Sequence, residues 1–458
     1  MPIVTINPAN GEPLRTYATW DARQVNDAVA RGHAAALDWG QEPIARRVEA
    51  LQRLAEELRR QKDTLAALVS REMGKPLAEA AGEVEKSAVT AIHYAENARR
   101  MLADEKVAID GVDAWVSHEP IGLVLAVMPW NFPVWQVMRF AIPAVACGNG
   151  ILLKHSPNVT GCALALATLF TDAGLPANLL TALVIDEASV PHTVDCLIAD
   201  DRIAAVTLTG SNRAGAAVGA AAGRASKKSV LELGGSDAFV VLEDADVPAA
   251  AAAAVKARFN NAGQSCVCAK RFIVAASVAE RFTELFVQGT RALAVGDPFE
   301  PGIQMGPLAR ADLRATLQRQ IDQSVAAGGQ LLVGGRAIEG NGCYFEPTVI
   351  ANTGPGMAVF DEETFGPVAA IAVARDDDDA VRLANASPFG LSVSVWSGSR
   401  ERAVGLARRI TTGAAFINAV TASDARLPFG GTKKSGYGRE LALAGVREFC
   451  NVRTYWAA

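Results

Sequence analysis

Cysteine and histidine are scarce in this sequence, and neither residue type clusters. The 458 residues include seven cysteines and five histidines, and no Cys-x-x-Cys pair occurs. An odd number of dispersed cysteines excludes a disulfide framework and is typical of a reducing compartment, so we expect a cytoplasmic protein. The dispersed histidines argue against a metal site.

A basic surface and a long apolar run are also missing. The net charge is −5 and the isoelectric point about 5.7, which argues against nucleic acid or a membrane as partner, because both select basic surfaces. The apolar run at residues 121–129 is far shorter than the ~20 residues that a membrane helix needs. The polar first residues lead into a turn at residues 7–11, so we expect no signal peptide.

The remaining composition is that of a large globular protein. The length allows about three domains of about 150 residues each. Apolar residues at helical spacing predict long amphipathic helices over residues 21–105, and a short turn between two apolar stretches predicts a β-hairpin over residues 106–117. The last strand-like run, residues 451–456, has no partner nearby in sequence, so we expect it to pair with this hairpin or with another subunit.

From residue 121 onward, strand-like and helix-like stretches alternate. The predicted strands are 121–127, 151–154, 179–185, 204–208, 229–233, 238–242 and 271–275. The predicted helices between and after them are 134–147, 160–172, 213–223, 245–258 and 278–294. Repeated βα units predict parallel sheets with helices on both faces, and such sheets bind ligands at the carboxyl ends of their strands. We therefore expect every functional motif to fall just after a strand, or at the helix that follows it.

Two motifs carry groups suited to carbonyl chemistry. Asn131 lies between two prolines in a rigid turn, where its amide can donate to an oxyanion, although a structural turn explains the motif equally well. Glu232 ends an apolar strand before two glycines. Burial would raise its pKa and make it a base near neutral pH, although a salt-bridged or capping glutamate is the simpler interpretation of this motif alone.

Three further motifs suggest a nucleophile and a nucleotide site. Cys266 lies in a Gly/Gln/Ser loop, a polar setting that suits a thiolate, although most cysteines are inert core residues. Glu363 and Phe365 place a carboxylate beside an aromatic ring, which suits a ribose and a flat ring. No Gly-x-Gly-x-x-Gly motif occurs. Instead, Gly210 allows close backbone approach and Ser211 opens a helix whose N-terminus favours pyrophosphate, although a plain turn fits as well.

Taken together and in this order, these motifs resemble the aldehyde dehydrogenase superfamily over essentially the whole chain, including the Gly-rich residues 429–436. The resemblance implies an α/β fold with two doubly wound parallel-sheet domains and a small β oligomerisation element. The implied parts are a dinucleotide-binding domain (1–105 and 121–232), a catalytic domain (233–440) and the oligomerisation element (106–120 and 441–458). The family implies a homodimer or homotetramer.

The resemblance also implies the catalytic roles. Cys266 attacks the aldehyde, Asn131 and the backbone N–H of Cys266 hold the oxyanion, and Glu232 activates the water that hydrolyses the thioester. The implied cofactor is NAD or NADP, bound by Trp130, Lys154, Thr209, Gly210, Ser211, Gly215, Leu233, Glu363 and Phe365. Many NAD-preferring members carry a glutamate three residues after the lysine, but this chain has Pro157, so the choice between the two cofactors stays open.

Arg139 indicates the substrate class. Asn131, Trp135 and Arg139 recur at helical spacing on a helix that opens at Pro133, so they share one face. An arginine along the aldehyde tunnel suggests a substrate with a distant carboxylate, and a surface ion pair between subunits is the alternative. Arg139 and Ser423 resemble residues of bacterial succinate semialdehyde dehydrogenases, which implies the oxidation of succinate semialdehyde to succinate. Arg258 and Arg426 are further candidates for this contact.

Several alternatives remain open from the sequence. Other semialdehydes or a broad range of aldehydes are possible substrates of the same fold. Relatives that transfer the acyl group to phosphate or CoA usually lack the glutamate base, so Glu232 favours hydrolysis. A binding or structural protein on this fold would be expected to lose the nucleophile, base or oxyanion donor. Cys268, two residues from Cys266, is either a redox partner of the nucleophile or a packed thiol.

Overall fold

The computed structural model describes residues 1–458. The chain begins with a small N-terminal hairpin, and four helices follow it. The hairpin strands are β1 (Ile3–Ile6) and β2 (Pro13–Tyr17). The helices are α1 (Ala22–Gln41), α2 (Ile44–Arg60), α3 (Lys62–Met73) and α4 (Leu77–Met101). They confirm the helices predicted over residues 21–105. The side chain of Asp21 caps α1 by accepting from the backbone of Gln24 at 2.8 Å, as a capping box requires.

The first large sheet has the order β19-β9-β8-β5-β6-β7. Its strands are β5 (Leu123–Met128), β6 (Gly150–His155), β7 (Leu180–Ala182), β8 (Ile203–Thr209), β9 (Lys228–Glu232) and β19 (Gly436–Tyr437). The connecting helices are α5 (Trp135–Cys147), η1 (Pro157–Val159), α6 (Thr160–Asp172), η2 (Glu187–Ser189), α7 (Val190–Ala199) and α8 (Asn212–Arg224). From β5 the chain adds β6 and β7 on one side of this strand and then β8 and β9 on the other side. The carboxyl ends of β5 and β8 therefore border a topological switch point.

The second large sheet has the order β12-β13-β14-β11-β10-β16-β17 and is parallel except for β12. Its strands are β10 (Asp237–Val241), β11 (Ala269–Ala275), β12 (Gln330–Val333), β13 (Thr348–Ala351), β14 (Val368–Ala374), β16 (Ser392–Trp396) and β17 (Ala414–Ile417). Its helices are α9 (Val247–Phe259), η3 (Asn260–Gly263), η4 (Ala276–Val278), α10 (Ala279–Arg291), α11 (Ala311–Ala326), α12 (Ala358–Asp361), α13 (Asp377–Asn385) and α14 (Arg400–Ala407). A two-stranded pair, β15 (Phe389–Gly390) with β18 (Thr432–Lys433), lies beside the link to the first sheet.

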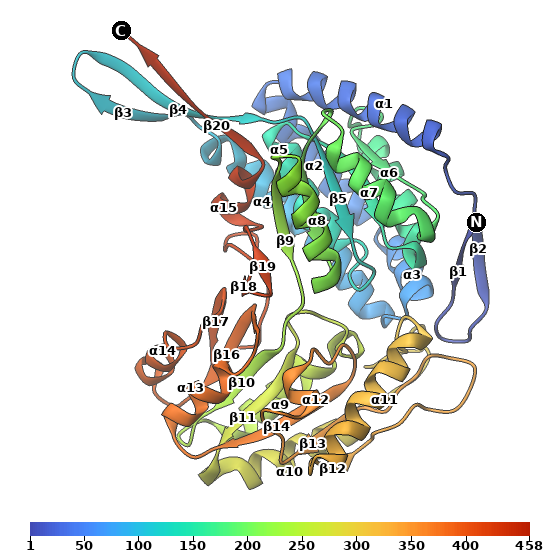
Figure 1. Cartoon of the computed structure of the whole chain (residues 1–458), viewed down its shortest axis with the longest axis vertical. Coiled ribbons are helices and arrows are strands. Elements are labelled where there is room, and N and C mark those ends of the chain that lie inside the picture. Colours follow the sequence, from blue (N-terminus) through green and yellow to red (C-terminus); the bar gives the residue numbers. More distant parts are fainter.

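A three-stranded antiparallel sheet projects from the body of the molecule (Figure 1). It consists of β3 (Glu105–Ile109), β4 (Val112–Pro120) and the C-terminal β20 (Cys450–Ala457), which follows α15 (Ala442–Glu448). The predicted hairpin is confirmed, and so is the pairing of the last strand with it, from Cys450 opposite Pro120 to Ala457 opposite Asp113. Trp115 and Tyr455 stack across the two strands with ring centroids 4.7 Å apart. No helix combines the length and the apolar character that crossing a membrane requires.

Both large sheets are covered by helices and bury continuous apolar strands, as a parallel α/β sheet requires. The first sheet occupies the upper half of Figure 1 and the second the lower half, and the link from β9 to β10 joins them. The predicted catalytic part, residues 233–440, includes one strand of the first sheet. This strand is Gly436–Tyr437, which pairs antiparallel with β9.

Candidate active site

The candidate site lies where the carboxyl ends of the first sheet face the amino ends of the second. From the first sheet come Asn131, after β5, and Glu232, at the end of β9. From the second sheet come Cys266, before β11, and Glu363 and Phe365, before β14. Cys266 comes after α9 and η3, and Glu363 and Phe365 come after α12, so these three residues precede strands of the second sheet. The two sheets therefore approach each other with opposite edges.

An unusual backbone shapes the loop that carries Cys266. Asn261, Ala262 and Gly263 have φ angles of 53°, 52° and 72°, a left-handed run that side chains other than glycine adopt at a cost. The Asn261 backbone N–H donates to Glu79 Oε2 at 2.9 Å, and its amide nitrogen donates to the Asn131 carbonyl at 2.8 Å. These contacts fix the nucleophile loop to α4 and to the turn that holds Asn131.

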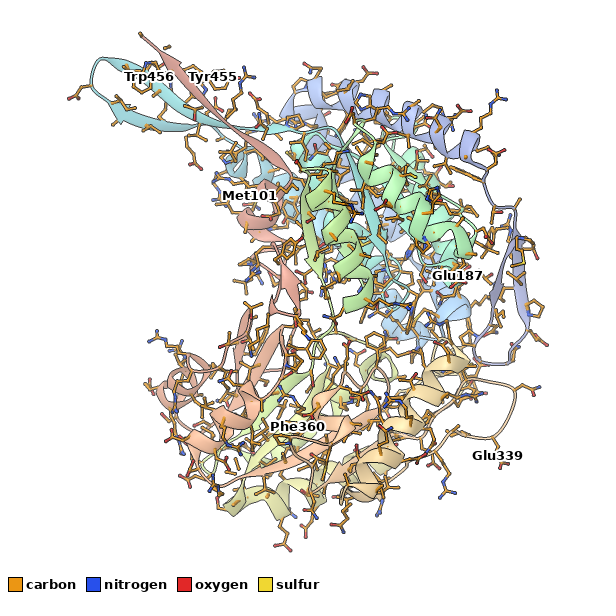
Figure 2. All side chains as sticks on the ribbon, viewed as in Figure 1. Met101, Glu187, Glu339, Phe360, Tyr455 and Trp456 are labelled. Carbon is orange, nitrogen blue, oxygen red and sulfur yellow. The ribbon has the colours of Figure 1, made fainter.

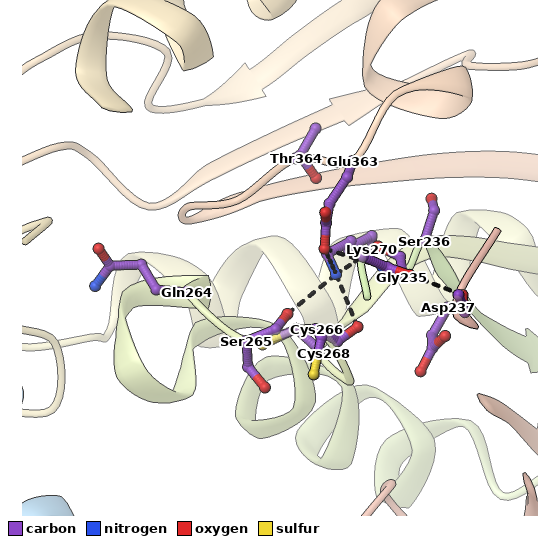
Figure 3. A network of polar contacts seen from close by, with 12 residues as sticks. Gly235, Ser236, Asp237, Gln264, Ser265, Cys266, Cys268, Lys270, Glu363 and Thr364 are labelled. Atoms are coloured by element: carbon purple, nitrogen blue, oxygen red, sulfur yellow. Dashed lines mark hydrogen bonds and ion pairs between the residues drawn. The ribbon is translucent and has the colours of Figure 1, made fainter. Parts of the chain in front are cut away.

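Lys270, which the sequence analysis did not identify, holds this loop from the other side (Figure 3). Its buried ammonium donates to the carbonyls of Gly235, Ser265 and Cys266 at 2.7, 3.0 and 3.0 Å, and to Glu363 Oε1 at 3.1 Å. One cation therefore connects three parts of the site: Gly235 between the two sheets, the loop that carries Cys266, and the Glu363 carboxylate before β14. A lysine after Cys-x-Cys-Ala carries no sequence signal for this role, since its partners are mostly backbone carbonyls.

Asn131 is placed to donate toward Cys266. Its Nδ2 donates to the Gln264 carbonyl at 3.0 Å, so one of its two N–H groups is held and the other is left for a ligand. The backbone N–H of Cys266 has no acceptor within the chain. The helix after this turn is fixed by the buried Glu83, which accepts from the backbones of Val134 and Trp135 at 2.8 Å each. Since α5 begins at Trp135, Asn131 precedes the helix rather than lying on its face.

Glu232 lies in a buried group of two carboxylates and one guanidinium. Burial and the neighbouring Glu440 raise the pKa of Glu232 well above its usual range, while Arg139 and Arg439 oppose this shift. Glu440 forms an ion pair with Arg139, and both side chains are only 3% exposed. Glu232 Oε1 accepts no hydrogen bond from the chain. Burial raises the pKa of Glu440 as well, but Glu440 has Arg139 as its ion-pair partner, whereas Glu232 has none. An unpaired carboxylate with a raised pKa suits a base near neutral pH.

The Cys266 thiol is enclosed by apolar and polar groups. Burial raises its pKa to about 12, and the positive charges of Arg139 and Lys270 oppose that rise. Cys268 is 4% exposed, burial raises its pKa, and its thiol donates to the Asn260 carbonyl at 4.0 Å. Both thiols are free, and a redox pairing between them stays a prediction.

On one side of Cys266 a cavity of about 60 Å³ collects most of the predicted cofactor residues. Its lining includes Trp130, Asn131, Thr209, Gly210, Glu232, Leu233, Gly234, Cys266, Glu363 and Phe365. The rings of Trp130 and Phe365 meet edge to face at 5.6 Å. Glu363 accepts from the Gly235 backbone at 3.0 Å and from Lys270 through the same oxygen, which leaves its second oxygen for a ligand hydroxyl.

The neighbouring backbone fits a dinucleotide. A side chain at Gly234 would overlap Glu363, and one at Gly215 would overlap Leu233, whereas nothing but Leu208 lies within 4 Å of the Gly210 Cβ position. Ser211 caps α8 by accepting from the Ala214 N–H at 3.3 Å, so the N-terminus of this helix points toward the crevice.

Lys154 is the remaining predicted cofactor residue, and it lies near the carboxyl end of β6. Burial lowers its pKa to about 8, and the nearby Glu187 opposes the shift. No carboxylate lies within ion-pairing distance of its ammonium, so a ribose hydroxyl or a phosphate can accept its hydrogen bonds. Pro157, which begins η1, supplies no carboxylate to repel a 2′-phosphate.

On the opposite side of Cys266 lies a larger cavity of about 220 Å³. The three predicted substrate residues, Trp135, Arg139 and Ser423, line it together with Cys266, Phe132 and Phe429. Arg139 does not lie on the surface, so the alternative of a surface ion pair is wrong. Its guanidinium is paired with Glu440, lies over the ring of Phe429 at 4.6 Å and donates to Thr209 Oγ1 at 3.3 Å.

The same cavity contains Lys86 of α4, which the sequence analysis missed. Its Nζ donates to Ser423 Oγ at 2.6 Å and lies 4.4 Å from the centre of the Trp135 ring. The two other candidate arginines do not line the cavity. Arg258 is fully buried and donates to the carbonyls of Ala269 and Thr364, and Arg426 is exposed and paired with Asp424.

Comparison with known proteins agrees with this geometry. The model of the aldehyde dehydrogenase family matches residues 1–455, so the chain belongs to the aldehyde dehydrogenase family. It is 48% identical over 453 residues to the NAD(P)+ succinate semialdehyde dehydrogenase of Escherichia coli (strain K12), covering 99% of this chain and 97% of that protein.

Two further relatives cover the whole fold. The chain is 44% identical over 461 residues to an NADP(+) succinate-semialdehyde dehydrogenase of Mycobacterium tuberculosis (strain H37Rv), with 100% of both chains covered. The crystal structure of succinic semialdehyde dehydrogenase from Streptococcus pyogenes in complex with NADP+ superimposes with a TM-score of 0.95 at 36% identity, covering 99% of each chain. The predicted family and fold class are thereby confirmed.

Proposed function

We propose that this protein oxidises succinate semialdehyde to succinate with reduction of NAD+ or NADP+. The observation that supports this most is the single cavity that joins Cys266 to Trp135, Arg139 and Ser423. An aldehyde carbon at Cys266 would leave its carboxylate among cationic and hydroxyl groups at the other end. The full-length similarity to succinate semialdehyde dehydrogenases supports the same substrate.

The first half of the reaction forms a thioester on Cys266. The Cys266 thiolate adds to the aldehyde carbon, and the carbonyl oxygen becomes an anion that Asn131 Nδ2 and the Cys266 backbone N–H stabilise. When bound, the nicotinamide supplies the acceptor of the hydride that leaves this carbon. Trp130 and Phe365 would contact the nicotinamide ring, and Glu363 would hold the adjoining ribose.

The second half hydrolyses the thioester. Glu232 takes a proton from a water molecule, the water oxygen attacks the acyl carbon, and the carbon–sulfur bond breaks to release the acid and the Cys266 thiolate. The raised pKa of Glu232 suits it to this proton transfer near neutral pH. Its position at the end of β9 puts it on the cofactor side of Cys266.

The cofactor is bound by residues of both sheets in this proposal. Thr209, Gly210, Ser211 and Gly215 bring the backbone and the α8 N-terminus to the pyrophosphate, and Leu233 packs beside them. Lys154 contacts the adenosine ribose. The absence of a carboxylate at Pro157 allows NADP as well as NAD, and relatives named for NAD(P)+ and for NADP(+) support both.

The three parts of the chain take separate roles. We assign cofactor binding to residues 1–105 and 121–232, the nucleophile to residues 233–440, and subunit assembly to residues 106–120 and 441–458. Val452 and Trp456 of β20 are 63% and 61% exposed, and Figure 2 shows Trp456 on the projecting sheet. This exposed apolar surface supports a homodimer or homotetramer, to be measured by sedimentation velocity. The seven free cysteines support a reducing compartment such as the cytoplasm.

A panel of aldehydes run with each cofactor tests this function. We expect the highest kcat/KM for succinate semialdehyde, lower values for its shorter and longer homologues, and much lower values for butanal, which has the same chain length without the carboxylate. Equal kcat/KM for butanal and succinate semialdehyde would show a broad-specificity enzyme instead. Consumption of aldehyde only when phosphate or CoA is added would contradict hydrolysis by Glu232.

A further inference from the structure

Lys86 is a cation of the aldehyde-side cavity without a carboxylate partner. Lys256 lines the same cavity but is exposed, whereas Lys86 contacts Ser423 and Trp135 of the cavity wall. Lys86 lies on α4 and is half-buried. Its one hydrogen-bond partner is the Ser423 hydroxyl at 2.6 Å, and the Trp135 ring lies 4.4 Å from its Nζ. No acidic side chain lies within 4.0 Å of its ammonium, although the chain forms such pairs in many other places. An aromatic face and a hydroxyl stabilise a cation less than a carboxylate does.

Arg139, the cation that the sequence pointed to, is in the opposite situation. Its guanidinium is paired with Glu440, and one of its nitrogens donates to Thr209. Both partners belong to the chain, and Glu440 is also the carboxylate that raises the pKa of Glu232. Arg139 therefore balances the charge of the hydrolytic base, and its capacity to bind a second carboxylate is reduced.

We propose that Lys86, with Ser423 beside it, is the main charged contact for the distal carboxylate of a short ω-oxo acid. This rests on the proposed function and adds the residue that selects the substrate. The substrate carboxylate would form the ion pair with Lys86 that no side chain of the chain provides. The Ser423 hydroxyl, which accepts a hydrogen bond from Lys86, would also donate one to the substrate carboxylate. Trp135 would pack against the methylene groups between the two ends.

The charge balance around Lys86 supports this contact. Burial and the neighbouring cations Arg139 and Lys75 lower its pKa to about 8, while Glu83 and Asp424 raise it. Glu83 is already paired with Lys75, and Asp424 with Arg426. A bound carboxylate would relieve the cost of a half-buried ammonium, whereas an uncharged aldehyde would leave that cost in place.

The test compares Lys86→Met, Lys86→Arg and Ser423→Ala with wild type, using succinate semialdehyde and butanal. Because a charge-assisted contact is lost, Lys86→Met should lower the ratio of the two kcat/KM values roughly 10- to 100-fold, through KM for succinate semialdehyde rather than kcat. Lys86→Arg should restore most of the ratio, and Ser423→Ala should lower it by less. Lys62→Met, which removes a lysine outside the cavity, is the matched control.

Succinate binding measured by calorimetry gives a readout that does not depend on turnover. Wild type and Lys86→Arg should bind succinate, and Lys86→Met should bind it at least roughly 10-fold more weakly. If Lys86→Met fails to fold, Lys86→Gln and the succinate affinity of Lys86→Arg decide the matter. An unchanged substrate ratio in a folded Lys86→Met or Lys86→Gln variant overturns the assignment of Lys86. A wild type without preference for succinate semialdehyde overturns the proposed function instead.

Discussion

The cofactor side and the aldehyde side of Cys266 differ in size, in charge and in how they are built. The cofactor side is a cavity of about 60 Å³ bordered by two carboxylates, Glu232 and Glu363, and by glycines. The aldehyde side measures about 220 Å³ and is lined by three cationic side chains, Lys86, Arg139 and Lys256, and by one carboxylate, Asp237. Cys266 lines both cavities, so most of the cationic side chains lie on one side of it and two carboxylates on the other.

This difference indicates how selection and catalysis are divided. On the cofactor side the glycines at 215 and 234 leave no room for side chains, so recognition there depends on shape and backbone approach. On the aldehyde side a cation without a partner acts on charge. Substitutions on the first side should therefore affect every aldehyde alike, while substitutions at Lys86 on the second side should separate charged from uncharged aldehydes.

The largest effect is expected from Glu232→Gln on the cofactor side. Removal of the base should lower steady-state kcat about 10²- to 10⁴-fold for every aldehyde, because thioester hydrolysis loses its proton acceptor. Acylation should persist, so rapid mixing should show a burst of reduced cofactor close to one equivalent per active site. Loss of the burst together with the steady state would place Glu232 in acylation instead. An effect confined to succinate semialdehyde would contradict the division between the two sides.

Asn131→Ala should have the next largest effect. Its amide has one N–H held by Gln264 and one free for the oxyanion, and loss of an oxyanion donor typically costs about 10²- to 10³-fold in kcat. The loss should be similar for butanal and succinate semialdehyde and should leave both KM values nearly unchanged, which stopped-flow measurement of the burst rate checks. Asn131→Asp is a useful comparison, since it keeps the volume but puts a negative charge beside the oxyanion. A normal burst rate in Asn131→Ala would contradict the role of the amide.

The sequence predicts the fold well because its signals are local. Alternating strands and helices from residue 121 predict the two parallel sheets, and the isolated final strand indicates its pairing with the hairpin. The relation between the two sheets is not a local property. For this reason the sequence does not show that Cys266 and Glu363 lie at amino ends of strands, opposite the carboxyl ends that carry Glu232 and Asn131.

The residues of the candidate site also fall into those that local sequence signals predict and those that only the tertiary structure shows. Motifs point to the proposed nucleophile, base and oxyanion donor, since each role requires a particular residue type in a particular loop. Charge pairing is a tertiary property, and Lys86 meets Ser423 across 337 positions of the chain. On its helix Lys86 follows glutamates and resembles an ordinary surface lysine. Arg139 is identified from the sequence, but its buried partner Glu440 is not.

The smallest predicted effect is a dependence of KM on pH that belongs to the aldehyde side alone. The pKa of Lys86 is lowered to about 8, with Arg139 and Lys75 favouring loss of the proton and Glu83 and Asp424 opposing it. Lys86 is therefore charged below pH 8 and loses its charge as the pH rises through that value. The KM for succinate semialdehyde should rise above pH 8, by at most about tenfold per pH unit.

The same pH change acts in the opposite sense on the cofactor side. The raised pKa of Glu232 means that this base retains its proton above its usual range, so kcat should increase as the pH rises. With butanal only this increase should appear, because butanal makes no contact with the Lys86 charge. Lys86→Arg should abolish the rise of KM while leaving the kcat profile in place, since a guanidinium keeps its proton throughout this range. A KM that rises equally for butanal, or that still rises in Lys86→Arg, would assign the titration to a group shared by both sides of Cys266.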